Sequence, residues 1–245
     1  MGNAPQTYRG VILSSREYKE KDRVIRFLTK DDGLLDIYVK GTGKLNSSNA
    51  FTSVPFMLCD ITAAPSHGYL YFRTGAIIES NSRIMNDLDT ITSASHFSDL
   101  LSDISGQSEN SSEAYELAVY SFYNLSKNPD KWELYTAAFN WRVLSMLGFT
   151  VVYSVTNDTG SVIEDNNYYY LSISGGEICS GKKSGYEYFR LSGVAVKALN
   201  YIATCDIQNL YGIKGSEGLA ESLKDFTLRY LSYQFDKDYK SRFSF

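Results

Sequence analysis

The sequence is poor in the residue types that most often carry out catalysis or bind transition metals. Its 245 residues include 3 cysteines and 2 histidines. An odd set of Cys59, Cys179 and Cys205 is too small for a disulfide scaffold and is typical of a reducing compartment. His67 has the setting of a turn residue, His96 that of a packed or solvated helix residue, and neither belongs to a His/Cys/Asp constellation. The sequence therefore predicts a protein that is not an enzyme and has no cofactor.

Long apolar segments are also missing. No run of about 18 apolar residues occurs, which excludes a membrane-spanning helix. The first 30 residues lack the apolar core of a signal peptide. We therefore expect a cytoplasmic protein with no membrane association.

A basic excess, which proteins that coat DNA usually need to neutralise phosphates, is absent as well. The formal net charge is -4. The distribution is uneven, because residues 1–50 hold nine Lys/Arg against six Asp/Glu and residues 81–150 hold four against nine. This asymmetry favours one nucleic-acid face near the N-terminus and a different face elsewhere.

Alternation of apolar and polar residues predicts five short strands in the first 80 residues, enough for a small barrel. In the third strand, Leu35, Ile37 and Val39 form the apolar face. The five strands are expected at 7–15, 22–30, 34–40, 54–62 and 69–78. The stretch 41–53 holds Gly, Asn and Ser around Lys44 and is typical of a loop.

The periodicity becomes helical after the barrel. Three helices are expected between 86 and 148, separated near 106–112 and 127–130. Residues 149–190 return to short strands rich in Tyr, Gly and Ser. Ser192 and Ser216 are in position to cap two final helices.

The best candidate site lies on the fifth strand, where Tyr69, Tyr71 and Arg73 would share one face. Tyr38 and Lys40 would extend it. A basic groove with aromatic faces is what holds single-stranded nucleic acid. Phosphate contacts are expected from Arg16, Lys19, Lys21, Arg23, Arg26, Lys40 and Lys44. The alternatives are cross-strand packing of the tyrosines and pairing of some cations with Glu17, Glu20 or Asp22.

Several short motifs follow one another along the chain in an order and spacing that match a known family. They are GVILSSREYKEKDR at 10–23, Thr29 with Gly33, Lys40-Gly41, Glu79-Ser80, RVLSMLGF at 142–149, GGEIC at 175–179 and Lys240-Ser241-Arg242-Phe243. In these features the whole chain resembles the RecO family of bacterial recombination mediators.

The resemblance implies an α+β multidomain fold with an N-terminal OB-fold barrel, a central and C-terminal helical bundle and a zinc-ribbon-like insertion. The domains would be a DNA-binding OB-fold at 1–80, a helical domain at 81–148 and 191–245, and the insertion at 149–190. The implied function is to bind single- and double-stranded DNA, to anneal complementary strands and, with RecR, to help RecA load onto DNA coated by single-strand-binding protein (SSB). A nucleoid-associated protein that is monomeric on its own is expected.

Family members often carry two C-x-x-C pairs in the insertion as zinc ligands. On that frame the four positions fall at Tyr153, Thr156, Cys179 and Lys182, and only the cysteine binds zinc as a thiolate. We expect no zinc here. Structural zinc contributes roughly 10 kcal/mol or more to a small module, so other packing must replace it. The candidates are Tyr168, Tyr169, Tyr170, Tyr186, Tyr188 and Phe189.

The family also docks the acidic, apolar tail of SSB on its helical part. A cleft that binds such a tail needs an apolar floor and a basic rim. The predicted contacts are Trp141, Arg142, Arg229, Lys240 and Arg242, with a surface salt bridge as the alternative for each arginine.

Two alternatives to a DNA-annealing mediator remain open. The first is a protein-interaction adaptor of the same pathway with little DNA affinity. The second is a metal-dependent nuclease, which would need a carboxylate cluster, and Asp31-Asp32 and Asp87 with Asp89 are the nearest candidates for one. Both pairs have the settings of turn or helix-capping residues.

Overall fold

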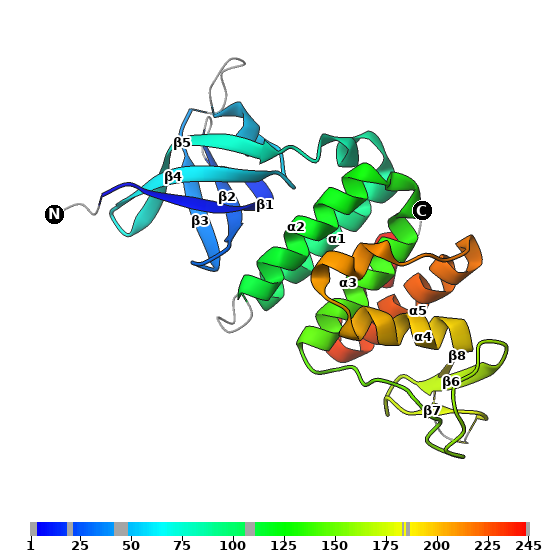
Figure 1. Ribbon diagram of the computed structural model, residues 1–245. Helices are drawn as coiled ribbons and strands as arrows, with labels where there is room; N and C mark the ends of the chain where they lie inside the picture. The colour runs from blue at the N-terminus through cyan, green and yellow to red at the C-terminus, as the bar shows by residue number, and fades with distance from the viewer. Residues whose placement is uncertain are drawn as a thin grey trace. The chain divides into compact units, whose positions relative to one another are not determined.

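The five predicted strands form a closed barrel (Figure 1). They are β1 (Gln6–Tyr18), β2 (Asp22–Thr29), β3 (Leu34–Val39), β4 (Leu58–Ser66) and β5 (Tyr69–Glu79). The order around the barrel is β1-β2-β3-β5-β4, and β4 pairs back onto β1. Only the β3–β5 pairing is parallel among these five strands. A five-stranded closed barrel with this order has the topology of an OB-fold.

The computed structural model describes residues 4–18, 22–41, 49–105, 111–182, 184 and 187–243. It divides into two units, Met1–Asp130 and Lys131–Phe245. The first contains the barrel and two helices, and the second contains three helices and a small sheet. Within the described ranges, no helix is long and apolar enough to cross a lipid bilayer.

The barrel has its own apolar core, drawn from the inward faces of all five strands. Its buried members are Ile12, Ile25, Phe27, Ile37, Val39, Met57, Cys59, Ile61, Ala63 and Phe72. Burial raises the pKa of the Cys59 thiol to about 12, so this thiol stays neutral and packs as an apolar group. The predicted start of the fourth strand at residue 54 is wrong by four residues. Phe56 there has a left-handed φ of 70°, which interrupts the extended chain.

Two helices complete the first unit. They are α1 (Leu88–Ile104) and α2 (Ser111–Lys127), and a short 3-10 helix, η2 (Ser82–Asn86), precedes them. Phe122 of α2 lies between Phe56, just before β4, and Phe97 of α1. Its ring centroid is 5.2 Å from that of Phe56 and 6.3 Å from that of Phe97. Asp87 caps α1 by accepting a hydrogen bond from the Thr90 backbone. These aromatic contacts join the two helices to the barrel.

The second unit is built around α3 (Trp132–Met146), which is buried on every side. Every residue from Leu134 to Leu144 is buried, as expected of a central helix rather than an amphipathic one. It packs with α4 (Gly193–Thr204) and α5 (Glu217–Phe235). Ser192 and Ser216 cap α4 and α5 as predicted, by accepting from Ala195 and Leu219. Gly148, at φ 77°, ends the turn after α3.

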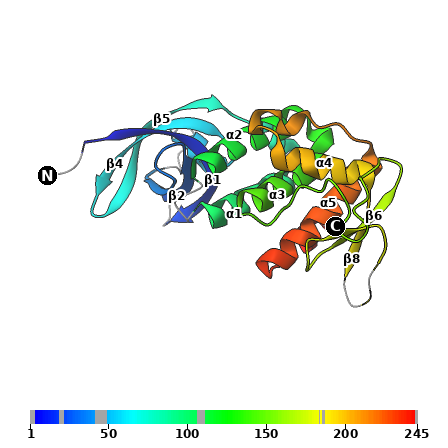
Figure 2. The same cartoon turned by 60° about the horizontal axis from the view of Figure 1, so that its bottom comes forward.

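A three-stranded sheet with the order β7-β6-β8 lies beside α4 and α5 (Figure 2). Its strands are β6 (Tyr168–Ser172), β7 (Ile178–Cys179) and β8 (Tyr188–Ser192). Tyr169, Leu171 and Leu191 are buried on one face of this sheet. Phe189 continues that face onto Phe226 of α5, with 5.3 Å between ring centroids. The remaining short 3-10 helices are η1 (Ala50–Ser53), η4 (Pro129–Lys131), η5 (Ile207–Gly212) and η6 (Lys240–Phe243).

Candidate nucleic-acid interface

Four tyrosines gather on one face of the barrel. Tyr38 of β3 is at the centre, with its ring centroid 5.3 Å from Tyr18, 5.0 Å from Tyr69 and 5.6 Å from Tyr71. The parallel pairing of β3 with β5 causes this, since it sets Tyr38 directly opposite Tyr71. Tyr69 is 53% exposed and Tyr18 is 43% exposed. These four residues are called the barrel tyrosine cluster below.

The predicted neighbours Tyr38, Tyr69, Tyr71 and Lys40 do come together in the structure. Tyr18 was not predicted to join them. It lies at the end of β1, two residues beyond Arg16, which is in register with Val24 of β2 and through it with Tyr38 of β3. The sequence signal, one more exposed aromatic residue next to a turn, is too weak to show this.

Cations lie next to the barrel tyrosine cluster. The Lys40 ammonium lies 5.1 Å from the centroid of the Tyr71 ring, in range for a cation–π contact. A hollow of about 310 Å³ opens beside this pair. It is lined by Lys40, Asn49, Ser66, His67, Tyr71, Phe72 and Arg73. No Asp or Glu of the described chain lines it, so the hollow favours an anionic ligand.

The central tyrosine of the cluster is held in its neutral form. Partial burial raises the pKa of the Tyr38 hydroxyl, and the neighbouring Tyr69 and Tyr18 raise it further. A tyrosinate would repel phosphate. The packing around Tyr38 therefore preserves a neutral ring on which a base can stack.

The predicted phosphate-binding arginines are partly committed to partners within the barrel. Arg16 and Arg26 both lie near Asp36, at 3.7 and 3.5 Å. Arg23 donates to the Ser15 hydroxyl and carbonyl at 2.8 and 3.0 Å. Exposed pairs of this kind are weak, so Arg16 and Arg26 stay available to phosphate, whereas Arg23 is fixed. Lys19, Lys21 and Lys44 lie outside the described residues.

The insertion holds its two turns together by hydrogen bonds between residues next to the zinc-frame positions. Asn157 and Ile178 exchange two bonds: the Asn157 backbone donates to the Ile178 carbonyl at 2.7 Å, and the Ile178 backbone donates to Asn157 Oδ1 at 2.8 Å. The Asp158 carboxylate accepts from the Ser180 hydroxyl at 2.7 Å. These bonds, called the Asn157–Asp158 clasp below, join the segments that carry the two frame pairs.

The frame positions themselves serve as packing and hydrogen-bonding groups. The buried Tyr153 hydroxyl donates to the Gly176 carbonyl at 2.9 Å, and the buried Thr156 hydroxyl lies 2.8 Å from that of Thr159. Cys179 is fully buried. The described residues contain no group of three or more His, Cys, Asp or Glu that could hold a metal ion.

Of the residues predicted to replace zinc by packing, Tyr169 and Phe189 lie on the inner face of the sheet. Tyr168, Tyr170 and Tyr188 lie on the other face, and Tyr186 lies outside the described residues. The sequence did not point to Asn157 or Asp158, because both read as ordinary turn residues.

The residues predicted for the SSB tail are not gathered at one place. Trp141 is 0% exposed and packs on Phe226 and Tyr230. Arg142 is buried too, and its guanidinium donates to the Ala203 and Cys205 carbonyls. Neither side chain offers surface to a peptide, because α3 is central in its unit.

The other three cations stay nearer the surface. The Arg229 guanidinium lies 5.6 Å from the Phe189 ring centroid, and the Lys240 ammonium is 3.6 Å from Asp225. Arg242 belongs to η6.

A closed barrel of OB topology with a tyrosine and lysine face, followed by a helical unit with a small sheet, defines the class of OB-fold proteins with an attached helical domain. Comparison with family models identifies the particular family. Recombination protein O N terminal matches residues 3–81, and Recombination protein O C terminal matches residues 85–243. The chain belongs to the recombination protein O family.

Curated relatives match over nearly their full length. DNA repair protein RecO of Acetivibrio thermocellus is 26% identical over 231 residues, which cover 94% of this chain and 92% of that protein. The protein of the same name from Clostridium novyi is 24% identical, with 95% and 90% covered. That of Clostridium acetobutylicum is 22% identical, with 95% and 94% covered.

Proposed function

We propose that this chain binds single- and double-stranded DNA through the barrel and anneals complementary strands, and that with RecR it helps RecA load onto SSB-coated DNA. Membership of the recombination protein O family supports a role in DNA repair and recombination. The barrel tyrosine cluster with Lys40 is the observation that supports DNA binding and strand annealing in particular.

The geometry of the cluster suits single strands in particular. Bases of a single strand expose their faces, and stacking on an aromatic side chain contributes about 1–3 kcal/mol per base. Lys40 and Arg73 line the hollow beside Tyr71, and the exposed Arg16 lies near enough to Tyr38 to interact with it electrostatically, so positive charge is available for the phosphates. In this function no bond is made or broken, so the chain acts without being an enzyme.

The test is strand annealing on complementary strands coated with SSB, with metal content measured on the same sample. We expect annealing without added nucleotide or metal, and binding that weakens steeply with salt. Absence of both oligonucleotide binding and annealing at low salt, with the protein folded, would sink the proposal. Magnesium-dependent cleavage of the strands would instead favour a nuclease.

The alternative is an adaptor with little DNA affinity, and one observation supports the partner docking on which it depends. A hollow of about 380 Å³ in the second unit has Val194, Tyr201 and Ile213 among its apolar residues and Lys214 at its edge. Lys197 and Asp165 also line it and form an ion pair at 2.6 Å, which leaves Lys214 as the cation without a carboxylate among the hollow's described ion pairs. An apolar floor with lysines suits the acidic, apolar tail of SSB better than the buried Trp141 and Arg142 do.

Two variants separate the mediator from the adaptor. Lys40→Glu/Arg73→Glu should strongly weaken oligonucleotide binding and annealing and leave a synthetic SSB tail peptide bound. Tyr201→Asp, at a residue that is 41% exposed and lines this hollow, should do the reverse. If Lys40→Glu/Arg73→Glu changes neither annealing nor DNA binding, the adaptor is the better description.

A further inference from the structure

The outer face of the three-stranded sheet in the second unit carries aromatic and cationic side chains in alternation. The Arg190 guanidinium lies 3.8 Å from the centroid of the Tyr168 ring. The Lys182 ammonium lies 5.5 Å from the centroid of Tyr170. Tyr170 and Tyr188 meet edge to face with 6.4 Å between their centroids. These five residues are called the second aromatic face.

Strand register produces this arrangement. Arg190 of β8 is paired directly with Tyr170 of β6, and Tyr168 is the next residue of β6 on the same side. The alternate residues between them, Tyr169 and Leu191, are buried. The inner side of the sheet supplies its packing, and the outer tyrosines are therefore not needed to fill the core.

The charge of the second aromatic face is of one sign. On this side β6 and β8 carry Tyr168, Tyr170, Tyr188, Arg190 and Ser192 at partly or fully exposed positions and Ser172 at a buried one, and none of these six residues is acidic. Among the described residues, no carboxylate forms an ion pair with Arg190 or Lys182. Tyr168 is 54% exposed, so the Arg190–Tyr168 pair is accessible to a ligand.

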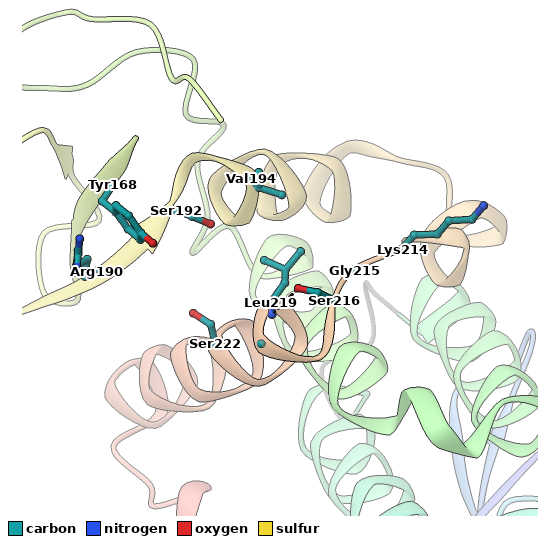
Figure 3. Close-up of a pocket in the computed structure, with 10 residues that line it drawn as sticks. Tyr168, Arg190, Ser192, Val194, Lys214, Gly215, Ser216, Leu219 and Ser222 are labelled. Atoms are coloured by element: carbon teal, nitrogen blue, oxygen red, sulfur yellow. Dashed lines mark hydrogen bonds between the residues drawn. The ribbon is translucent and has the colours of Figure 1, made fainter. Parts of the chain in front are cut away.

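The pair also borders a hollow of about 500 Å³ (Figure 3). Tyr168 and Arg190 lie side by side at one end of it, and Val194 and Leu219 lie between α4 and α5. A hollow of this size holds a small organic group. A ligand on the sheet would therefore have room beside the Tyr168 ring.

We propose that the second aromatic face is a second binding site for single-stranded nucleic acid, with bases stacked on Tyr168 and Tyr170 and phosphates held by Arg190 and Lys182. Stacking platforms interleaved with cations are what sequence-independent single-strand binding uses. This site rests on the DNA-binding function proposed for the barrel and extends it. One chain with two such faces can hold two strands at once, which annealing requires.

An acidic peptide is the competing ligand for any cationic surface. It needs the cations and an apolar floor, but it does not need exposed rings between the cations. Three tyrosines among two cations favour nucleic acid. The tail-docking hollow proposed above shares Val194, Lys214 and Leu219 with the hollow beside Tyr168. It is lined by neither Tyr168 nor Arg190, so variants at these two residues test the second aromatic face alone.

The test compares two double variants of the full chain that lose the same chemistry at different places. Tyr168→Ala/Arg190→Ala removes the second aromatic face. Tyr233→Ala/Lys131→Ala is the control, because Tyr233 is likewise 54% exposed and Lys131 is an exposed cation. Both are measured for binding of a labelled oligo-dT at low salt, for annealing rate and for thermal melting. Each of the two double variants is also combined with the barrel variant Tyr38→Ala/Tyr71→Ala.

We expect Tyr168→Ala/Arg190→Ala to weaken the oligo-dT binding that remains in the barrel variant by about tenfold or more and to slow annealing by the otherwise normal protein. The control should change neither. Should Tyr168→Ala/Arg190→Ala melt early, Arg190→Gln and ultraviolet crosslinking of the wild-type chain to oligo-dT replace it, with crosslinks expected in residues 168–170.

Three results overturn the second site. The sheet variant could match the control in binding and annealing, no crosslink could form at 168–170, or the sheet variant could lose only binding of the SSB tail peptide. In the first two cases the tyrosines and Arg190 pack the sheet and do no more, and in the third they bind the acidic peptide instead of nucleic acid. A wild-type chain that binds no oligo-dT at all would refute the barrel function as well, and so the two failures are distinguishable.

Discussion

The barrel and the three-stranded sheet both present tyrosines beside cations, but they support them differently. In the barrel, a closed core of inward-facing residues holds every strand, and the four tyrosines contact one another. In the sheet, β7 has only two residues, and the turns are joined by the Asn157–Asp158 clasp. The barrel face is therefore fixed by a closed apolar core, whereas the sheet face has one buried apolar side and depends in addition on a few polar bonds.

The difference predicts where each region is vulnerable. Changes at the barrel surface should alter DNA binding and leave stability intact, because the core lies beneath. Changes at the supports of the sheet should alter stability first. The predictions below test this contrast.

The largest effect is expected at the barrel surface. Tyr38→Ala/Tyr71→Ala removes two stacking rings and should weaken binding of single-stranded DNA by about 100-fold. Tyr38→Phe/Tyr71→Phe keeps the rings and should bind like the wild-type chain. Fluorescence anisotropy with a labelled oligonucleotide measures both. Equal loss in the two variants would mean that the hydroxyls, not the ring faces, matter.

The next effect concerns the contact between α4 and the segment before β6. A Cβ on Gly193 would lie 1.8 Å from the Glu164 carbonyl oxygen. Gly193→Ala should therefore cost about 3 kcal/mol of unfolding free energy, measured by urea denaturation. Gly212→Ala, where a Cβ meets nothing within 4 Å, is the control. An unchanged midpoint for Gly193→Ala would contradict the close approach.

A smaller loss is expected at the clasp. Asn157→Ala leaves the buried end of β7 without its acceptor and should cost about 1–2 kcal/mol, with no recovery when zinc is added. Asn167→Ala removes an exposed bond to Glu164 and should cost less. Denaturation curves followed by tyrosine fluorescence compare the two. Restoration of Asn157→Ala by zinc would show that the turns still form a metal site.

The smallest effect is a pH dependence of the same clasp. Hydrogen bonds from Ser180 lower the pKa of Asp158 from 3.8 to about 2. Because the folded pKa is the lower one, the stabilisation is complete above the unfolded value and is lost as pH falls from about 4 to about 2. Asp158→Asn should lack this component of acid destabilisation in a pH series of thermal melts. Identical acid profiles for the wild-type chain and Asp158→Asn would exclude a stabilising role of the ionised Asp158 carboxylate.

Much of the fold follows from local patterns. Alternation predicts the strands, and Ser192 and Ser216 cap their helices as expected. The start of β4 was misplaced because the left-handed backbone at Phe56 is set by packing against α2, which local propensity does not contain. For the same reason the predicted SSB-tail contacts at Arg142 and the neighbouring Trp141 fall on buried side chains, since no pattern in α3 distinguishes a helix buried on all sides from one with a free face.

The candidate site was predicted in part. Tyr69 and Tyr71 share a face by strand alternation, and the sequence placed Tyr38 nearby. The Asn157–Asp158 clasp and the pairing of Tyr168 with Arg190 join residues about 20 apart along the chain. Such contacts depend on register between strands, which a single sequence leaves undetermined.

The most direct test of the central claim is to crosslink the wild-type chain to a single-stranded oligonucleotide and map the linked peptides. A DNA-binding barrel predicts crosslinks at Tyr38 and at Tyr69 or Tyr71, which disappear when salt is raised. Crosslinks that avoid β3 and β5 altogether, in a protein that still binds the oligonucleotide, would contradict it.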